Sequence, residues 1–423
     1  MPRPILHKVN KDHHGFYTVG PVQTYSKLEA IEHSVRLRQP ISWDYNRAVF
    51  GSVDWTQEPP GSLDFYYQQR AQQLREHYDY LVLFYSGGSD SHNALMSFVT
   101  NNIFVDEIVQ WHQLEALRGD RSHNANAEQF ATSIPITQTL LATNPTYRHT
   151  VHRLIDFTQY KAEIFTDQKI LDRWWYVNND FQTPHAHAIT EIKNLYPAYR
   201  QLIDSGKSVA FIWGTEKPNF RVDQHNRLHC GFADISISPF VGVDRKIANN
   251  PGDHDEMFYW TPDLPELIVK QAHVVKRYID MFEDHQADGN LVLRGDFGSP
   301  DQYGQYSDRK NLPHLVFRRG NQAYTLMRNG VRRLLYPYWD PTHLVRSVPQ
   351  SRLFSDVDEA FVNSNTPFET SRRQFLKNLV HMRQWMRQHA PDYWYEYTYN
   401  PQVAPLRAGF EHFFNFYCLD KEH

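Results

Sequence analysis

A run of six residues, Ser86 to Ser91, has the composition of a loop that binds phosphate groups. Its letters are SGGSDS, and it directly follows the short apolar segment Tyr80–Tyr85. Two glycines let the backbone approach a ligand without an intervening Cβ atom. Unpaired N–H groups at the start of a following helix attract an anion, and serine hydroxyls add further donors. The sequence therefore predicts a loop that cradles a polyphosphate.

Asp90 distinguishes this loop from a passive anion site. A carboxylate repels phosphate unless a cation bridges the two, and Mg²⁺ is a hard cation that carboxylate and phosphate oxygens hold together. We therefore expect Asp90 to be a magnesium ligand and to be needed for catalysis; a serine-rich turn without a ligand is the alternative. A second candidate, Gly206-Lys207-Ser208, fails as a Walker motif because Gln201 replaces its first glycine and the run precedes a strand.

In its context the loop resembles the SGGxDS signature of the PP-loop, or N-type, ATP pyrophosphatases, which include asparagine synthetase, GMP synthetase and tRNA-lysidine synthetase. The resemblance is specific over Tyr80–Leu95, supportive to about Pro218, and closest to asparagine-synthetase-like proteins, including phage-encoded ones. It implies ATP and Mg²⁺ as ligands, cleavage of ATP between the α- and β-phosphates, an acyl- or imidoyl-adenylate, and displacement of AMP by a nucleophile. The pyrophosphate ligands that it implies are Ser86, Gly87, Gly88, Ser89, Asp90 and Ser91.

A second motif, Phe211–Pro218, has the letters FIWGTEKP and follows another apolar run. Strand ends at one edge of an α/β sheet are where ligands bind. The family resemblance implies that Gly214 lies beside the nucleotide. Lys217 is a candidate to stabilise charge on the α-phosphate, and Glu216 is a candidate metal ligand or general base. A surface loop with a solvated ion pair is the alternative interpretation.

Three further residues complete the candidate site. Tyr85 directly precedes the loop and is a candidate nucleotide contact. Trp111, between Gln110 and His112, ends the second predicted strand, where these side chains contact adenine or ribose or simply cap the strand. Asp234 is a candidate second metal ligand at the same sheet edge.

Other chemistry-bearing clusters are weaker. His185 and His187 are spaced too closely to share a helix face. Gly252–Glu256 contains three carboxylates that suit Mg²⁺, but a solvated loop is favoured. Cys230 and Cys418 are the only cysteines, so a disulfide framework and a four-thiolate zinc site are excluded. They lack the spacing of thiolating enzymes, which disfavours sulfur insertion.

These candidates require a scaffold that brings strand ends together. Apolar strands alternate with helical segments, which predicts an α/β, Rossmann-like parallel sheet of the PP-loop type, flanked by α+β N- and C-terminal regions. After Lys217 this alternation is predicted to end. The expected strands are Tyr80–Tyr85, Val105–Trp111, Thr150–Phe157 and Ser208–Trp213. Three helices are expected: one that begins near Ser91, one over 127–141 that is interrupted by Pro135, and one over 198–205.

The rest of the chain is divided around this domain. We predict an aromatic-rich α+β region over 1–76, the ATP-binding domain over 77–284, and a basic hairpin and helical region over 285–423. The additional elements expected are helices at 25–36, 63–77, 262–282 (N-cap Thr261) and 371–389, a hairpin of 220–222 with 227–229, a hairpin of 323–327 with 331–336 around Asn329-Gly330, and a linker at 285–312.

Composition limits the partners. The 423-residue chain is 41% hydrophobic and 22% charged, with a net charge of −4, which is typical of a soluble protein of two or three domains. No apolar run approaches the roughly 18 residues of a membrane span, so we expect a cytoplasmic protein without membrane contact. The segment 305–352 is rich in arginine, including Arg318 and Arg352, and in aromatic residues; it suits nucleic acid, an acidic substrate or an ordinary solvated face. The substrate is expected to be a small carboxylate or a nucleobase, with tRNA or DNA, or a non-catalytic nucleotide-binding regulator, as alternatives.

Overall fold

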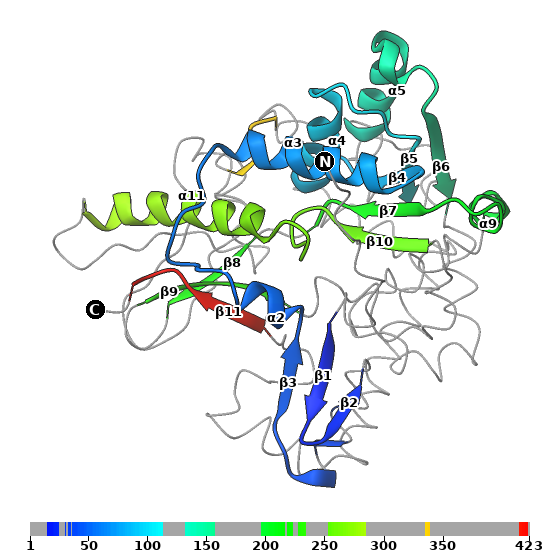
Figure 1. Cartoon of the computed structure of the whole chain (residues 1–423). Helices are drawn as coiled ribbons and strands as arrows, with labels where there is room; N and C mark the ends of the chain where they lie inside the picture. The colour runs from blue at the N-terminus through cyan, green and yellow to red at the C-terminus, as the bar shows by residue number, and fades with distance from the viewer. Residues whose placement is uncertain are drawn as a thin grey trace, which may run out of the picture.

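A five-stranded, all-parallel sheet forms the centre of the molecule (Figure 1). The computed structural model describes residues 15–24, 36–112, 132–156, 196–215, 218–222, 227–233, 253–284, 335–338 and 414–421, together with residues 30, 33 and 34. The strand order is β10-β7-β4-β5-β6. The predicted α/β class is confirmed. The strands are β4 (Tyr80–Phe84), β5 (Glu107–His112), β6 (Val151–Asp156), β7 (Val209–Trp213) and β10 (Asp253–Met257).

Burial explains why the central strands are apolar throughout. All five residues of β7 are buried, as are the last four of β4, because helices cover both faces of a parallel sheet. β6 lies at one edge, and its residues Val151 and Leu154 are more than a third exposed. The four strands predicted from apolar runs therefore form, each within three residues of its expected bounds.

The fifth strand corrects the sequence prediction. Gly252–Glu256 favoured a solvated loop, yet β10 pairs in parallel with β7 along its whole length. Glu256 is only 4% exposed, and its buried charge is compensated by Arg70, whose Nη2 donates to its Oε2 at 2.5 Å. A paired carboxylate thus occupies an inward position that a strand pattern normally gives to an apolar side chain. The parallel sheet therefore gains one more strand after Lys217, while the described elements between β7 and β10 are strands and not helices.

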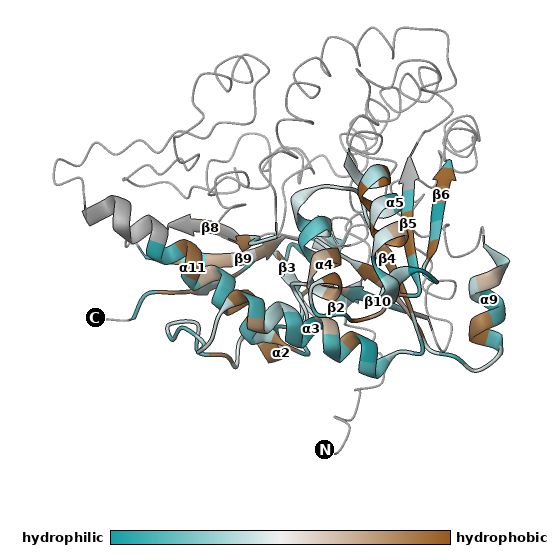
Figure 2. Ribbon diagram, turned by 90° about the horizontal axis from the view of Figure 1, so that it is seen from above, coloured by the Kyte–Doolittle hydropathy of each residue, from teal (hydrophilic) through white to brown (hydrophobic). Residues whose placement is uncertain are grey.

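Helices cover both faces of the sheet. Ser62 Oγ accepts from Phe65 N at 3.2 Å and so caps α3 (Leu63–His77). This helix packs against α4 (Ser89–Val99), which follows β4, and against the long helix α11 (Pro265–Asp284) (Figure 2). On the other face, Tyr199 packs against Phe211. The helices are α2 (Arg47–Phe50), α3 (Leu63–His77), α4 (Ser89–Val99), α5 (Ile134–Thr143), α9 (Pro197–Asp204) and α11 (Pro265–Asp284), with a 3-10 turn at η3 (Pro145–Tyr147).

Pro135 lies in the first turn of α5, where its missing N–H costs nothing. Residues 132 and 133 before it form a π-helical turn, and 127–131 of the predicted helix lie outside the described residues. The start of the last long helix differs from its prediction. α11 begins at Pro265, three residues after the predicted start. Thr261 caps a turn before it, since its Oγ accepts from Asp263 N at 3.2 Å.

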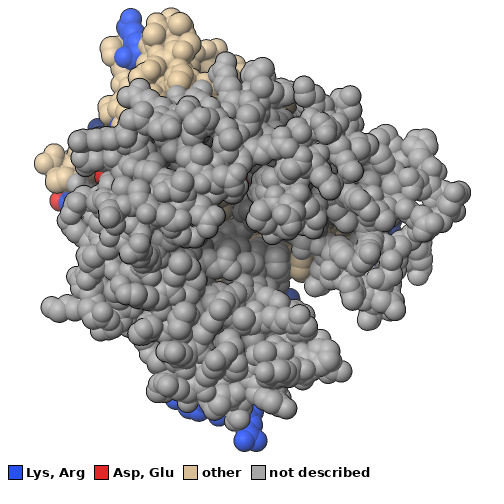
Figure 3. Space-filling view, turned by 180° about the vertical axis from the view of Figure 1, so that it is seen from behind, with Lys and Arg blue, Asp and Glu red and all other residues tan. Residues whose placement is uncertain are grey.

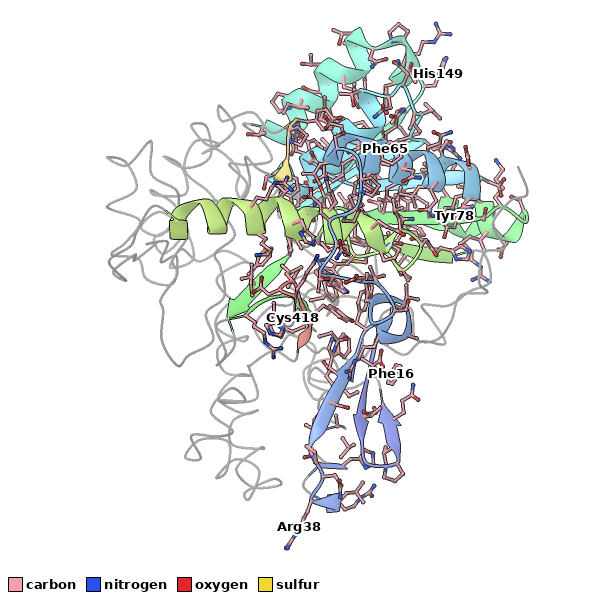
Figure 4. All side chains as sticks on the ribbon, turned by 60° about the vertical axis from the view of Figure 1, so that its left-hand side comes forward. Phe16, Arg38, Phe65, Tyr78, His149 and Cys418 are labelled. Atoms are coloured by element: carbon pink, nitrogen blue, oxygen red, sulfur yellow. The ribbon has the colours of Figure 1, made fainter. Side chains whose placement is uncertain are left out.

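Two antiparallel sheets lie beside the central one. In the second, β8 (Asn219–Val222) and β9 (Leu228–Ala233) confirm the hairpin predicted around residues 223–226, and β11 (Phe414–Cys418) pairs with β9. Asn415 of β11 accepts from Tyr45 N and donates to Trp43 O, each at 2.7 Å, so residues near both chain ends are held together. Figure 4 shows Phe16, in the first of these sheets, well below Phe65 of α3. The first sheet contains β1 (Phe16–Val19), β2 (Val22–Thr24) and β3 (Ile41–Asp44); the second contains β8 (Asn219–Val222), β9 (Leu228–Ala233) and β11 (Phe414–Cys418).

Several predictions fall outside the described residues, including the linker at 285–312, the helix at 371–389 and most of the second hairpin. Leu335 is helical and a turn follows it, so the expected strand 331–336 does not reach its predicted end. No helix in the described part of the chain is long and apolar enough to cross a bilayer.

Candidate functional site

The phosphate-loop candidate lies where the order of the sheet reverses. β4 is the first strand of this sheet in the sequence; β5 and β6 extend it on one side, and β7 and β10 on the other. The connections on the two sides diverge at the carboxyl end of β4, and open α/β sheets bind ligands in the crevice formed there. Ser86 to Gly88 occupy this position, and α4 begins at the next residue.

The backbone of the loop requires its first glycine. Gly87 has φ of 88°, a left-handed conformation that residues with a Cβ rarely adopt. Gly88 is the N-cap of α4, and no side chain in the described structure caps this helix. The N-cap residue therefore supplies no side-chain acceptor to the first N–H groups of α4, which suits an anion at this helix end.

Two serines brace the loop internally. Ser91 Oγ accepts from Ser86 N at 3.2 Å, donates to Gly88 O at 3.1 Å, and lies 3.0 Å from Ser86 Oγ. Ser86 Oγ also accepts from Gly88 N at 3.2 Å. Ser86 is exposed and can meet a ligand, whereas Ser91 is buried and fixes the loop's shape.

Ser89 contributes a buried hydroxyl. The residue is 4% exposed, and its Oγ has no hydrogen-bond partner among the described residues. Asn93, one turn further along α4, has a buried Oδ1 that also lacks a hydrogen-bond partner among the described residues. An unsatisfied buried polar atom is costly, so this pair marks the start of α4 as a place where further polar contacts are favourable.

Asp90 directs one carboxylate oxygen inward. The residue is half-buried and its Oδ1 is buried. Its main-chain carbonyl accepts from Tyr259 Oη at 2.7 Å. Burial, followed by the charge of the Asp90 carboxylate, raises the pKa of Tyr336 well above its ordinary value, so this hydroxyl lies close to the carboxylate and stays protonated. Tyr259 thus bonds to the backbone of Asp90, and Tyr336 lies beside its carboxylate.

Gly214, at the carboxyl end of β7, lies directly against the first turn of α4. A Cβ added here would stand 2.7 Å from Ser91 Cα and 3.1 Å from Ala94 Cβ. The structure thus brings Gly214 beside Ser91 of the loop. The contact uses the missing side chain to let the strand end approach the helix backbone.

The variant Gly214→Ala should lower both stability and nucleotide affinity. Its new Cβ must push α4 away from β7, at a cost of about 1–3 kcal/mol for an overpacked position. Thermal unfolding and titration with a fluorescent ATP analogue measure the two effects. Gly206→Ala is the comparison: its φ of 87° makes alanine strained, but no atom lies within 4 Å of its Cβ, so only stability should fall. An unchanged affinity in Gly214→Ala would contradict a loop shaped by this contact.

Other predicted contacts have structural partners. Tyr85 is buried, and its hydroxyl lies 3.0 Å from His92 Nδ1, so it supports α4 from within. Gln110 Nε2 donates to Ser133 O at 2.9 Å and to Thr137 Oγ1 at 2.8 Å, which fixes the start of α5. Gln110 is therefore committed to the scaffold. Trp111 and His112 lie in β5, but their side chains are not among the described groups.

The predicted metal ligands are not brought together within the described chain. Lys217, Glu216, Asp234, His185 and His187 lie outside the described residues. Among the residues that are described, no three His, Cys, Asp or Glu side chains form a group able to hold a metal ion. Asp255 and Glu256 of β10 have different partners, since Asp255 accepts from Trp213 Nε1 at 3.1 Å while Glu256 pairs with Arg70.

The remaining predictions concern sulfur and basic residues. Burial raises the pKa of the Cys230 thiol well above its ordinary value, which keeps it protonated and unreactive. On the face seen in Figure 3, the largest groups of described Lys and Arg atoms lie near the top and bottom edges. Of the basic segment 305–352, the structure describes only Leu335–Tyr338.

Sequence reasoning missed three residues of this site. Tyr259 follows β10, Tyr336 lies in the C-terminal region, and Asn93 is the buried amide of α4 that donates to Tyr259 Oη at 3.2 Å. Tyr259 and Tyr336 carry no local sequence signal. Asn93 does carry one, because it is a polar residue on the apolar face of α4. Comparisons with protein-family models, with curated proteins and with solved structures find no match to this chain, so its site is interpreted from its own residues.

Proposed function

We propose that the chain binds ATP with Mg²⁺ at the Ser86–Ser91 loop and catalyses adenylation, releasing pyrophosphate. The observation that carries the proposal is the position of a left-handed glycine and an uncapped helix at the switch point of a parallel sheet. The acceptor in this proposal is a carboxylate or a nucleobase carbonyl, and an amine or ammonia then displaces AMP.

The residues of the loop fit a pyrophosphate group. The N–H groups at the start of α4 and the hydroxyl of Ser86 are donors, and the helix dipole adds positive potential. Ser89 supplies a buried hydroxyl without a partner among the described residues. Asp90 supplies the carboxylate that Mg²⁺ requires beside phosphate oxygens. Lys217 and Glu216 follow Gly214 closely in the sequence and remain our candidates for stabilising the α-phosphate and for metal binding or proton transfer. Trp111 stays a candidate adenine contact and Asp234 a candidate second metal ligand.

The reaction proposed is a displacement at the α-phosphorus. The acceptor oxygen forms a bond to the α-phosphorus as the bond from that phosphorus to the bridging oxygen breaks, and pyrophosphate leaves with the bonding electrons. Negative charge develops on the leaving group. Backbone amides fixed before the reaction stabilise this charge without reorganisation.

The test is product analysis. The protein is incubated with ATP, Mg²⁺, an ammonium salt and panels of carboxylates, nucleobases and tRNA, and nucleotide products are separated by chromatography. We expect AMP and pyrophosphate in equal amounts with at least one acceptor. Production of ADP and phosphate alone would exclude adenylation, and ATP binding without any product would favour a nucleotide-binding regulator.

A further inference from the structure

Two chains of hydrogen bonds pass through buried tyrosines: one ends on the carbonyl of Asp90, and the other ends on the carbonyl of Leu335, next to Tyr336. In the first, Asn93 Nδ2 donates to Tyr259 Oη at 3.2 Å, and Tyr259 Oη donates to the Asp90 carbonyl at 2.7 Å. Tyr259 is fully buried, and burial raises its pKa well above the ordinary value, so the hydroxyl keeps its proton. Since this hydroxyl donates its hydrogen bond to the main-chain carbonyl of Asp90, the first chain fixes the backbone of the loop's aspartate.

The second chain fixes a segment from the C-terminal region. Gln271 Nε2, on α11, donates to Tyr67 Oη at 2.9 Å, and Tyr67 Oη donates to the carbonyl of Leu335. Tyr67 and Leu335 are both fully buried. The segment Leu335–Tyr338 is therefore docked on α3 and α11 by a bond that its backbone accepts.

Docking brings Tyr336 between the two chains. Its ring centroid lies 5.6 Å from that of Tyr259, the residue is 1% exposed, and its hydroxyl neighbours the Asp90 carboxylate. The Asp90 Oδ1 atom is itself buried, while the residue as a whole is half-buried. A hydroxyl at this place can hold one carboxylate oxygen and leave the other for a cation.

We propose that Tyr336 is the positioning residue of the magnesium ligand, so that the C-terminal segment Leu335–Tyr338 completes the pyrophosphate site. The inference rests on the proposed function. A carboxylate held at one oxygen presents the other in a fixed direction, whereas an unheld carboxylate must be ordered when the cation binds. Loss of an outer hydrogen-bond partner typically lowers metal affinity about 10- to 100-fold.

The experiment uses the full chain with Tyr336→Phe, which removes one hydroxyl and retains the ring. Binding of a fluorescent ATP analogue is titrated with Mg²⁺, and we expect the Mg²⁺ midpoint to rise about tenfold. Binding in EDTA should be unchanged, because the backbone amides of the loop are untouched. This difference separates positioning of Asp90 from a general loss of structure.

Tyr338→Phe is the matched control. Tyr338 lies in the same segment, but its hydroxyl neighbours Thr100 and Asp64, and Thr100 is at the far end of α4 from Asp90. The same chemical change there should leave the Mg²⁺ midpoint at its parental value. Equal shifts in both variants would overturn a specific role for Tyr336.

The outcomes distinguish the inference from the function beneath it. If the parent protein shows no Mg²⁺-dependent nucleotide binding, the proposed function fails. If the parent binds and Tyr336→Phe has the parental midpoint, only the positioning role fails. Should Tyr336→Phe be poorly folded, Tyr67→Phe takes its place, because it releases the Leu335 carbonyl and keeps the Tyr336 hydroxyl. A smaller rise in the Mg²⁺ midpoint then supports the inference, and an unchanged Mg²⁺ midpoint contradicts it.

Discussion

The variant Asp90→Asn should fold like the parent and lose roughly a hundredfold or more of ATP-dependent pyrophosphate release, because a catalytic metal stabilises transition-state charge by several kcal/mol. Asparagine keeps an oxygen that can accept from Tyr336, and the main-chain carbonyl keeps its bond from Tyr259. The fold is therefore expected to persist. Only the charge that binds Mg²⁺ is removed.

Initial rates of pyrophosphate release, measured over a range of Mg²⁺ concentrations, test this result. Asp204→Asn is the control: Asp204 lies at the end of α9, pairs with Arg200 at 2.9 Å, and has a side chain that is 58% exposed. The same loss of charge there should leave the rate unchanged. Full activity in Asp90→Asn would remove Asp90 from the metal site.

The sheet was predictable because its central strands are buried on both faces. Tyr80–Phe84 and Val209–Trp213 read as short apolar runs, and such runs have few other places in a folded chain. Their order was not predictable, since no local pattern states that β7 pairs with β4 and β10 with β7. The switch point that frames the loop emerges only from this pairing.

β10 was missed for a physical reason. Its letters, DHDEM, lack the apolar alternation of a strand. Its polar side chains are instead satisfied by residues distant in the sequence: Arg70 pairs with Glu256, and Trp213 donates to Asp255. Propensity describes a residue in its local context, and here tertiary partners override it.

The candidate site divides in the same way. The loop was predictable because its chemistry is contiguous: the glycines, serines and aspartate follow one strand and open one helix. The tyrosines beside Asp90 were not predictable, because Tyr259 and Tyr336 reach its neighbourhood from segments far along the chain. Gln110 shows the opposite case, a polar residue near the site that is committed to the scaffold.

The buried ion pair of β10 leads to the largest stability effect that we expect. Arg70 Nη2 donates to Glu256 Oε2 at 2.5 Å and to Met257 O at 2.9 Å, and Tyr78, labelled in Figure 4, donates its hydroxyl to the other carboxylate oxygen. The Arg70 side chain is 1% exposed and that of Glu256 is 5% exposed. Apart from Glu256, the nearest carboxylate is that of Asp263, at 3.9 Å among the described ion pairs. Arg70 thus depends on Glu256 for its neutralisation.

Glu256→Gln should lower the free energy of unfolding by roughly 3 kcal/mol or more, because it leaves the buried Arg70 cation without its main counter-charge. Chemical denaturation monitored by circular dichroism measures the change. Glu76→Gln, an identical substitution on the exposed side of α3, should stay within about 0.5 kcal/mol of the parent. Replacing both Arg70 and Glu256 by methionine should regain part of the loss, since an apolar pair needs no neutralisation. If Glu256→Gln lowered stability no more than Glu76→Gln, the Arg70–Glu256 pair would not be what fixes β10 to α3. We expect a large loss of stability because Glu256, whose charge disguised β10 in the sequence, is also the residue that anchors this strand.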